Sequence, residues 1–329
     1  MPTVAHAFSP KEWKVAVVSD ATNAGATGIG TTMLQLDVDS VGMPSLNPNQ
    51  VVDVRSGVGR TFKDEDFFQD NKLKVSEISL SGTMHLDDGH KLLLQNICND
   101  VSGDIAVASG FSPASQKYGS AVANTASSLT LVMQPSDVTN QQGLEFFGCV
   151  VTSFTLSADA TTEGGRYKFS ATLQTGKVPD LASTAEPTIS PYANTTDIFL
   201  SSASGIKVYA KDAILQSFST TIESPAVFTG FNATGYEVVA RGAEIAVTAE
   251  ATVKYDGNTK DLINLFDTQT SALAGNSLVV TNNNAYGVLI DNAVLTDVSL
   301  NEGDIMMLDV AMKAVDDGTD ALISFDVTA

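Results

Sequence analysis

The chain contains two long segments with the same pattern, and this internal repeat limits its possible folds more than any other feature. Residues 75–97 and 242–266 each start with an alternating strand pattern that carries Glu-Ile, continue into Asp-Gly, and end in a short Leu-rich helix pattern. Glu77 matches Glu244, at a spacing of 244 − 77 = 167 residues. A period near half the chain predicts two tandem domains rather than a solenoid of short repeats.

Two further matches keep the same order along the chain. Leu34-Gln35 matches Leu215-Gln216 at a spacing of 181 residues, and the segment 152–156 matches 296–300 at a spacing of 144. The falling spacing indicates that the first copy is the longer one. We therefore expect a first domain over residues 1–179, a connecting segment rich in Pro, Ser and Thr over 180–205, and a second domain over 206–329.

The charge balance restricts the partners of such a chain. Its 329 residues include 38 Asp and Glu against 18 Lys and Arg, a net charge of −20. A protein that grips nucleic acid needs clustered basic residues, so this class is disfavoured, whereas a surface that DNA slides past is compatible. The sequence has no signal-peptide pattern and no apolar run of membrane-spanning length, so we expect no membrane association. Cys98 and Cys149 are expected to be buried free thiols in a reducing compartment.

The secondary-structure pattern is mainly β. Segments with period-2 alternation dominate, and 244–255 is typical: Ile, Val, Ala and Tyr alternate with Glu, Thr and Lys. Only two helices are predicted, at His90–Cys98 and Thr259–Phe266. Each copy is expected to close with a strand pair, at 150–158 with 167–174 and at 294–300 with 305–314.

The sequence offers little catalytic chemistry. It has three histidines and no HExxH, GxSxG, CxxC or P-loop pattern. Gly57-Val-Gly59 and Gly28-Ile-Gly30 are fragments of a phosphate-binding pattern that do not continue, and the acidic loop at 316–320 is too short for an EF-hand. We therefore expect no enzymatic activity, no cofactor and no bound metal.

The two closing units resemble a known family. Residues 150–176, with Val-Val-Thr-Ser-Phe-Thr-Leu followed by Glu-Gly-Gly-Arg-Tyr-Lys-Phe, resemble the closing hairpin of the tail tube (major tail) proteins of long-tailed bacteriophages. Residues 293–314 resemble the same unit again. Together with the strand, Asp-Gly and helix segments, the resemblance covers most of 30–176 and 206–329. It rests on a pattern of elements with few fixed residues.

The resemblance implies a fold and an assembly. The fold would be two tandem β-sandwich domains, each with a short flanking α-helix, in rings whose inner strands merge into a central β-barrel. Most members of this family have one domain and form hexamers, so a two-domain chain implies a trimeric ring with pseudo-sixfold symmetry. A hexamer with the second copy as an outer decoration is the other arrangement.

The resemblance also implies a location and partners. The protein would lie in the virion tail after assembly in the host cytoplasm. Its partners would be further copies of itself, a tape-measure protein, and tail terminator and baseplate proteins, with DNA passing through without specific binding. The alternative function is a capsid decoration or surface-adhesion β-sandwich protein.

Strand alternation and loop composition give candidate residues for the two surfaces of such a tube. An anionic lumen would prevent DNA from adhering, whereas the same carboxylates could simply face solvent on an outer sheet. The lumen candidates are Glu77, Asp159, Glu244, Glu250, Asp297 and Asp309. Aromatic and basic residues in the long loops 45–74 and 225–241 suit contacts between rings, unless the loops fold back and bury them. The inter-ring candidates are Arg55, Arg60, Phe67, Phe68, Phe231 and Arg241.

Overall fold

The structure of the chain is a computed structural model. The described residues are 12–20, 32–44, 50–52, 67–69, 75–85, 87–98, 128–135, 143–177, 179–181, 187–192, 197–200, 205–232, 235–241, 245–267, 276–282, 286–302, 305–315 and 322–327.

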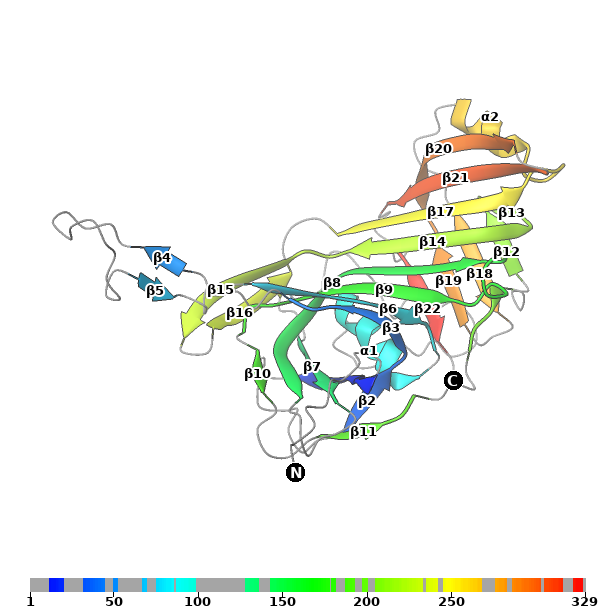
Figure 1. Cartoon of the computed structure of the whole chain (residues 1–329). Helices are drawn as coiled ribbons and strands as arrows, with labels where there is room; N and C mark the ends of the chain where they lie inside the picture. The colour runs from blue at the N-terminus through cyan, green and yellow to red at the C-terminus, as the bar shows by residue number, and fades with distance from the viewer. Residues whose placement is uncertain are drawn as a thin grey trace.

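Eight long antiparallel strands form the main sheet, and they are drawn side by side in Figure 1. Four of them come from residues up to 200, which we call the first half, and four from residues after 204, which we call the second half. The two groups meet where β8 pairs with β14. In spatial order the strands are β3 (Val38–Gly42), β6 (Ser76–Thr83), β9 (Lys168–Thr175), β8 (Leu144–Asp159), β14 (Leu215–Glu223), β17 (Ala246–Lys254), β21 (Met306–Ala314) and β20 (Ala293–Glu302).

Alternating side chains give this sheet one apolar and one polar face. In β17, Val247, Ala249, Ala251 and Val253 are buried on the core side, while the residues between them point to the other side. The same alternation runs through β6, β9 and β14. An antiparallel sheet with this pattern covers the core with one face and leaves the other available to water or a partner.

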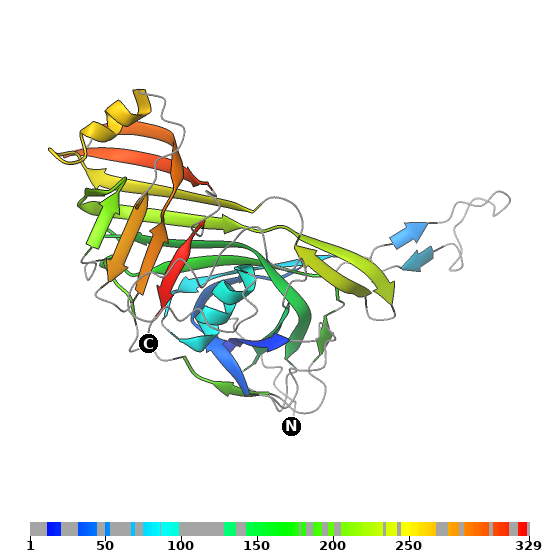
Figure 2. The same ribbon diagram turned by 180° about the vertical axis from the view of Figure 1, so that it is seen from behind.

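In the first half, the core is closed by a second layer that continues from β8. The first part of β8 pairs with β7, and the order continues to β1, β2 and β11. Gly148 has a φ of 59° within β8, a conformation that suits glycine. The helix α1 (Asp88–Ile97) buries Leu93, Leu94 and Ile97 inside this curved layer (Figure 2). The strands are β1 (Lys14–Asp20), β2 (Thr32–Leu36), β7 (Ser128–Gln134), β10 (Asp180–Leu181) and β11 (Thr188–Ser190).

In the second half, the second layer is a separate five-stranded sheet. Its spatial order is β13 (Lys211–Asp212), β12 (Gly205–Val208), β18 (Leu278–Asn282), β19 (Tyr286–Ile290) and β22 (Ser324–Val327). A second helix, α2 (Asp261–Asp267), lies against β20. Apolar residues of both halves, such as Phe154 and Val310, belong to one continuous buried cluster.

Two hairpins extend from the main sheet. One is formed by β15 (Ala226–Asn232) and β16 (Gly235–Arg241), and the other by β4 (Gln50–Val52) and β5 (Phe67–Gln69). They occupy equivalent places in the chain, because β4 and β5 lie between β3 and β6, and β15 and β16 lie between β14 and β17. The β4–β5 hairpin stands away from the body in both views (Figures 1 and 2).

These elements confirm the mainly β class. The two predicted helices are present with bounds that differ from the prediction by one or two residues, and both predicted closing strand pairs are present. Neither described helix has the length and hydropathy that crossing a membrane requires. Both cysteines are free and buried.

The connecting segment over 180–205 is attached to the first half where the structure describes it. The strand β10 pairs with β8, and β11 runs parallel to β2. Further along, Asp197 forms a bridge with His85, and Phe199 with Arg166. These contacts make the described residues of this segment an outer edge of the first half.

The two four-stranded groups share their irregularities as well as their order. A register shift at Asp39 interrupts the pairing of β3 with β6, and one at Gln216 interrupts the pairing of β14 with β17. Likewise, shifts occur at Thr152 in β8 and at Thr296 in β20, opposite β9 and β21. Bulges are specific features of a strand pair, so matching bulges give a residue-by-residue correspondence between the groups.

This correspondence changes part of the sequence alignment. The bulges at Thr152 and Thr296 reproduce the spacing of 144, but strand pairing matches Ser79 with Glu250, a spacing of 171. Glu77 therefore corresponds to Thr248, and its alignment with Glu244 is wrong. In the same way, the strand pairing gives a spacing of 177 residues between β3 and β14, and this replaces the spacing of 181 that matched Leu34 with Leu215. Each of these two sequence matches is therefore four residues out of register with the strand pairing.

Candidate assembly surface

Small hydroxyl side chains form a continuous row across the polar face of the main sheet. One row across the strands consists of Ser40, Ser81, Ser170, Thr155, Thr221 and Thr248. Where the two halves meet, the hydroxyls of Thr155 and Thr221 are hydrogen bonded at 2.9 Å. The sheet therefore continues across this join, which we call the seam between β8 and β14, without a break in surface chemistry.

Five of the six lumen candidates lie on this polar face. Glu77 and Glu250 are exposed, as is Asp297, while Asp159 and Asp309 are partly buried. Asp309 accepts hydrogen bonds from the Thr252 hydroxyl at 2.7 Å and the Asn301 amide at 3.1 Å. The sixth candidate, Glu244, lies outside the described residues. The strand register thus brings together carboxylates that are far apart in the sequence.

The same face carries charged residues that the sequence did not single out. Glu223 ends β14 on this side, and the alternation of buried Phe218, Thr220 and Ile222 could have identified it. Lys168 and Lys254 also lie here, together with Lys313 opposite Thr248. With Asp39 of β3 and the five described lumen candidates, the strands of this face therefore carry seven described carboxylates against these three lysines.

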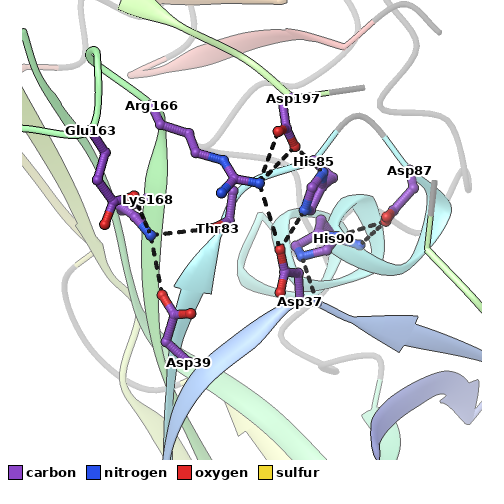
Figure 3. A network of polar contacts seen from close by, with 10 residues as sticks. All are labelled: Asp37, Asp39, Thr83, His85, Asp87, His90, Glu163, Arg166, Lys168 and Asp197. Atoms are coloured by element: carbon purple, nitrogen blue, oxygen red, sulfur yellow. Dashed lines mark hydrogen bonds and ion pairs between the residues drawn. The ribbon is translucent and has the colours of Figure 1, made fainter. Parts of the chain in front are cut away.

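Lys168 is neutralised by its neighbours. Its ammonium lies 3.2 Å from Asp39 and 3.0 Å from Glu163, and donates to the Thr83 hydroxyl at 3.3 Å (Figure 3). The seam close to it is hollowed, with a volume of about 350 Å³ lined by residues that include Asp159, Lys168 and Glu250. Since two carboxylates surround one ammonium, the net charge near the seam stays negative.

A polar network fixes the start of the edge strand β3. The buried His85 ring has Nε2 at 2.7 Å from Asp37 and Nδ1 at 2.9 Å from Asp197, and Arg166 lies 2.9 Å from Asp197 (Figure 3). Tyr192 stacks on His85 with ring centroids 4.9 Å apart. The network joins β3, β6 and the connecting segment, and thereby orients the free edge of the first half.

His90 extends this network to the start of α1. Its Nε2 lies 3.4 Å from the backbone nitrogen of Asp37, and its Nδ1 is hydrogen bonded to the Asp87 carboxylate at 2.7 Å. Asp87 caps the helix by accepting the His90 backbone N–H at 2.9 Å. Burial raises the pKa of Asp87, but the hydrogen bond and charge of His90 outweigh it and hold this pKa below its usual value. No group of three or more potential ligands among the described residues is arranged to hold a metal ion.

Both outer edges of the main sheet are open. Within the described strands, β3 pairs only with β6 and β20 only with β21. An open edge presents unpaired backbone groups and is suited to pair with another chain. The two edges also expose apolar residues, Met43 just after β3 at 50% and Leu300 in β20 at 44% exposure.

Arg241 joins the two halves from the inside. Its guanidinium donates to the backbone carbonyls of Val151 at 2.6 Å and Ser224 at 2.9 Å, and to that of Asn96. The Asn96 side chain in turn accepts the N–H of Val151 at 2.7 Å. Arg241 is only 8% exposed, so we withdraw it from the inter-ring set. The sequence shows a basic residue at the end of a loop and gives no sign of the carbonyls around it.

Some of the other inter-ring candidates lie outside the described residues, and the side chains of the rest are not described. Phe67 and Phe68 belong to β5 and Phe231 to β15, but their side chains are not among the described ones, and Arg55 and Arg60 lie outside the described residues. The β15–β16 hairpin itself packs on the end of the first half. The N–H of Tyr236 donates to the carbonyl of Gly176 at 3.0 Å.

A comparison with protein families gives one match. The model of a family described as phage tail tube protein matches residues 95–329, which is more than half of the chain and includes six of the eight main-sheet strands, all except β3 and β6. No curated protein matches the sequence.

Proposed function

The chain belongs to the phage tail tube protein family, and from this membership and its open-edged sheet we propose that it polymerises into stacked rings that form the conduit for DNA ejection. The observation that carries the proposal is the continuous eight-stranded sheet, polar on one face and open at both edges. The family match favours this function over a capsid decoration or surface-adhesion protein.

We propose that three chains form one ring. Each chain supplies two four-stranded groups with the same order and the same bulges, so three chains supply 3 × 8 = 24 strands in six similar groups. The matching bulges support an origin by domain duplication. Closing a sheet into a barrel removes its edges, which explains why two open edges are tolerated in one chain.

The polar face would line the channel. Its small hydroxyl side chains give DNA few groups to bind, and its excess of carboxylates repels phosphate. The lysines do not reverse this, because Lys168 is held between Asp39 and Glu163. The acidic residues Glu77, Asp159, Glu223, Glu250, Asp297 and Asp309 would form the lining, with Glu244 as a further candidate.

Contacts between rings would come from the two hairpins. The β4–β5 hairpin projects from the body (Figure 1), and the β15–β16 hairpin occupies the equivalent place in the second half. A tape-measure protein inside the tube, and terminator and baseplate proteins at its ends, would be the remaining partners. Assembly would take place in the host cytoplasm.

Electron microscopy of the purified protein tests the assembly. We expect rings or tubes with an open centre and threefold symmetry, with six similar features around the channel. A hexamer of chains would show six copies of the whole chain instead. Monodisperse monomers at all concentrations would contradict the proposal.

Charge reversal tests the lining. Replacing Glu250 and Asp297 by Lys should leave assembly intact but slow DNA ejection, because each new ammonium can contact phosphate. The matched control replaces the exposed Asp88 and Asp212, which lie off the polar face, and changes the net charge by the same amount. If assembled virions of both double variants ejected DNA equally fast, the polar face would not line the channel.

A further inference from the structure

We propose that β20 of one chain pairs with β3 of the next in one defined antiparallel register, with Leu300 opposite Met43 and Asn301 opposite Gly42. This inference rests on the proposed ring and goes further by assigning the residues that meet between chains. The seam between β8 and β14 within one chain serves as the template.

The seam supplies the register. Within the chain, Leu156 lies opposite Thr220, and Ser157 opposite Ser219, in an antiparallel pair. Both Leu156 and Thr220 are essentially fully buried, at 0% and 1% exposure. If the two halves are equivalent around the ring, the pair formed between chains repeats this arrangement.

The matching bulges transfer the register to the outer edges. Thr152 of β8 corresponds to Thr296 of β20, which carries Leu156 onto Leu300. Asp39 of β3 corresponds to Gln216 of β14, which carries Thr220 onto Met43. The same spacing of 177 follows independently through β6, β9, β17 and β21, because Gly42 pairs with Ser79 and Ser219 with Glu250.

An independent observation agrees with this register. Leu300 and Met43 are both large apolar residues that the single chain leaves 44% and 50% exposed. Both point to the core side of the sheet by strand alternation, as Leu156 and Thr220 do. Exposed apolar residues on soluble chains are common singly, but here one residue from each free edge is placed opposite the other. Ring closure would therefore bury both in one contact.

The alternative register follows from sequence similarity alone. The spacing of 181 between Leu34 and Leu215 would place Met43 opposite Thr296, four residues away from Leu300. At about 3.4 Å per residue the two registers differ by about 13 Å along the strand. A disulfide needs β-carbons about 4 Å apart, so cross-linking separates them clearly.

The experiment uses paired cysteines in the full chain. Met43→Cys combined with Leu300→Cys is assembled under reducing conditions, checked for rings by microscopy, oxidised and run on a non-reducing gel. The control is Met43→Cys with Thr296→Cys. Cys98 and Cys149 are buried and do not compete. We expect the first variant to give a band of three cross-linked chains, several-fold stronger than any cross-linked product of the control.

The possible outcomes separate three claims: the register, the pairing of β20 with β3, and the ring itself. Rings that cross-link only in the control variant would overturn the register. Rings that cross-link in neither variant would overturn the pairing of β20 with β3. The proposed ring would stand in both cases. Absence of rings from the unmodified protein would overturn the proposed function itself. If Met43→Cys prevented assembly, Gly42→Cys with Asn301→Cys on the polar face would test the same register.

Discussion

The two halves of the chain share their main-sheet strands but differ in the layer behind them. In the first half, β8 runs for 16 residues and passes from the main sheet into the second layer. In the second half the corresponding path is divided between β19 and β20 at Asp291 and Asn292. At the other end both halves are interrupted, since Asp37 separates β2 from β3 and Ala213 and Ile214 separate β13 from β14.

This comparison shows which structural features the two halves have in common. Strand order, bulges and polar face are common to both, and these are the features that a barrel of similar strands requires. The second layers, the helix lengths and the connecting segment differ, and none of them would line a channel. We therefore expect a ring that is close to sixfold at the channel and threefold at its periphery.

The largest effect is expected from replacing Arg241, which links the two halves. Replacing Arg241 by Met removes the donor of three backbone carbonyls, those of Val151, Ser224 and Asn96. Buried acceptors without a donor cost about 1–3 kcal/mol each, so we expect the free energy of unfolding to fall by about 4 kcal/mol. Urea unfolding should then show two transitions, one for each half.

Arg241→Lys is the matched control for this prediction. It keeps the positive charge but cannot reach several carbonyls with one planar group, so its loss should be intermediate. A single transition with an unchanged midpoint in Arg241→Met would contradict the role of this residue as a link between the halves.

The second largest effect is expected at Gly176, where the β15–β16 hairpin of the second half covers the first half. The β15–β16 hairpin lies on Gly176, and a β-carbon there would come within 2.7 Å of the Tyr236 ring and 2.9 Å of the Phe228 ring. By the bulge correspondence the equivalent residue of the second half is Val315. Replacing Gly176 by Val makes the halves more alike and should cost about 1–3 kcal/mol by overpacking.

The displaced hairpin should also weaken stacking. We expect Gly176→Val to form rings but fewer long tubes, measured by electron microscopy at equal protein concentration. Gly257→Val is the control, because nothing lies within 4 Å of a β-carbon at Gly257. Tubes of normal length from Gly176→Val would show that the position of this hairpin does not matter for stacking.

The sequence predicted what depends on local pattern. Both helices and both closing strand pairs followed from periodicity and turn residues, and alternation placed Glu77, Asp159, Glu250, Asp297 and Asp309 on one face. These features need only neighbouring residues to be specified. Alternation also reveals Glu223 once β14 is given its full length.

What the sequence did not predict depends on contacts between distant segments. The pairing of β8 with β14, the attachment of 180–205 to the first half, and the burial of Arg241 all join residues far apart in the chain. The strand pairing and its bulges at Asp39 and Gln216 give a correspondence that differs by four residues from the one that sequence similarity indicates. A bulge has no composition signal of its own, because it is defined by the partner strand.

A smaller effect is expected from the cap of α1, which differs from that of α2. Asp87 caps α1 through the His90 N–H at 2.9 Å, whereas before α2 the Asp256 carboxylate accepts the N–H of Asn258 at 2.9 Å in a turn. Asp87→Ala should lower the stability of the first half by about 1 kcal/mol. Asp88→Ala removes an exposed carboxylate from the same helix turn and should change the unfolding midpoint much less.

The smallest effect is the pH dependence that Asp87 confers on the first half alone. Because His90 holds the pKa of Asp87 below its unfolded value of 3.8, the native state favours the ionised form. This contribution to stability is complete above the unfolded pKa and is lost as the pH falls through the lower folded pKa. Asp87→Asn keeps a capping side chain but cannot ionise, so thermal unfolding between about pH 5 and pH 2 should depend less steeply on pH in this variant. The unfolding of the second half, followed separately in the Arg241→Met background, should respond to acid identically with and without Asp87→Asn. An unaltered acid dependence of the first half would show that the contact between Asp87 and His90 does not stabilise it.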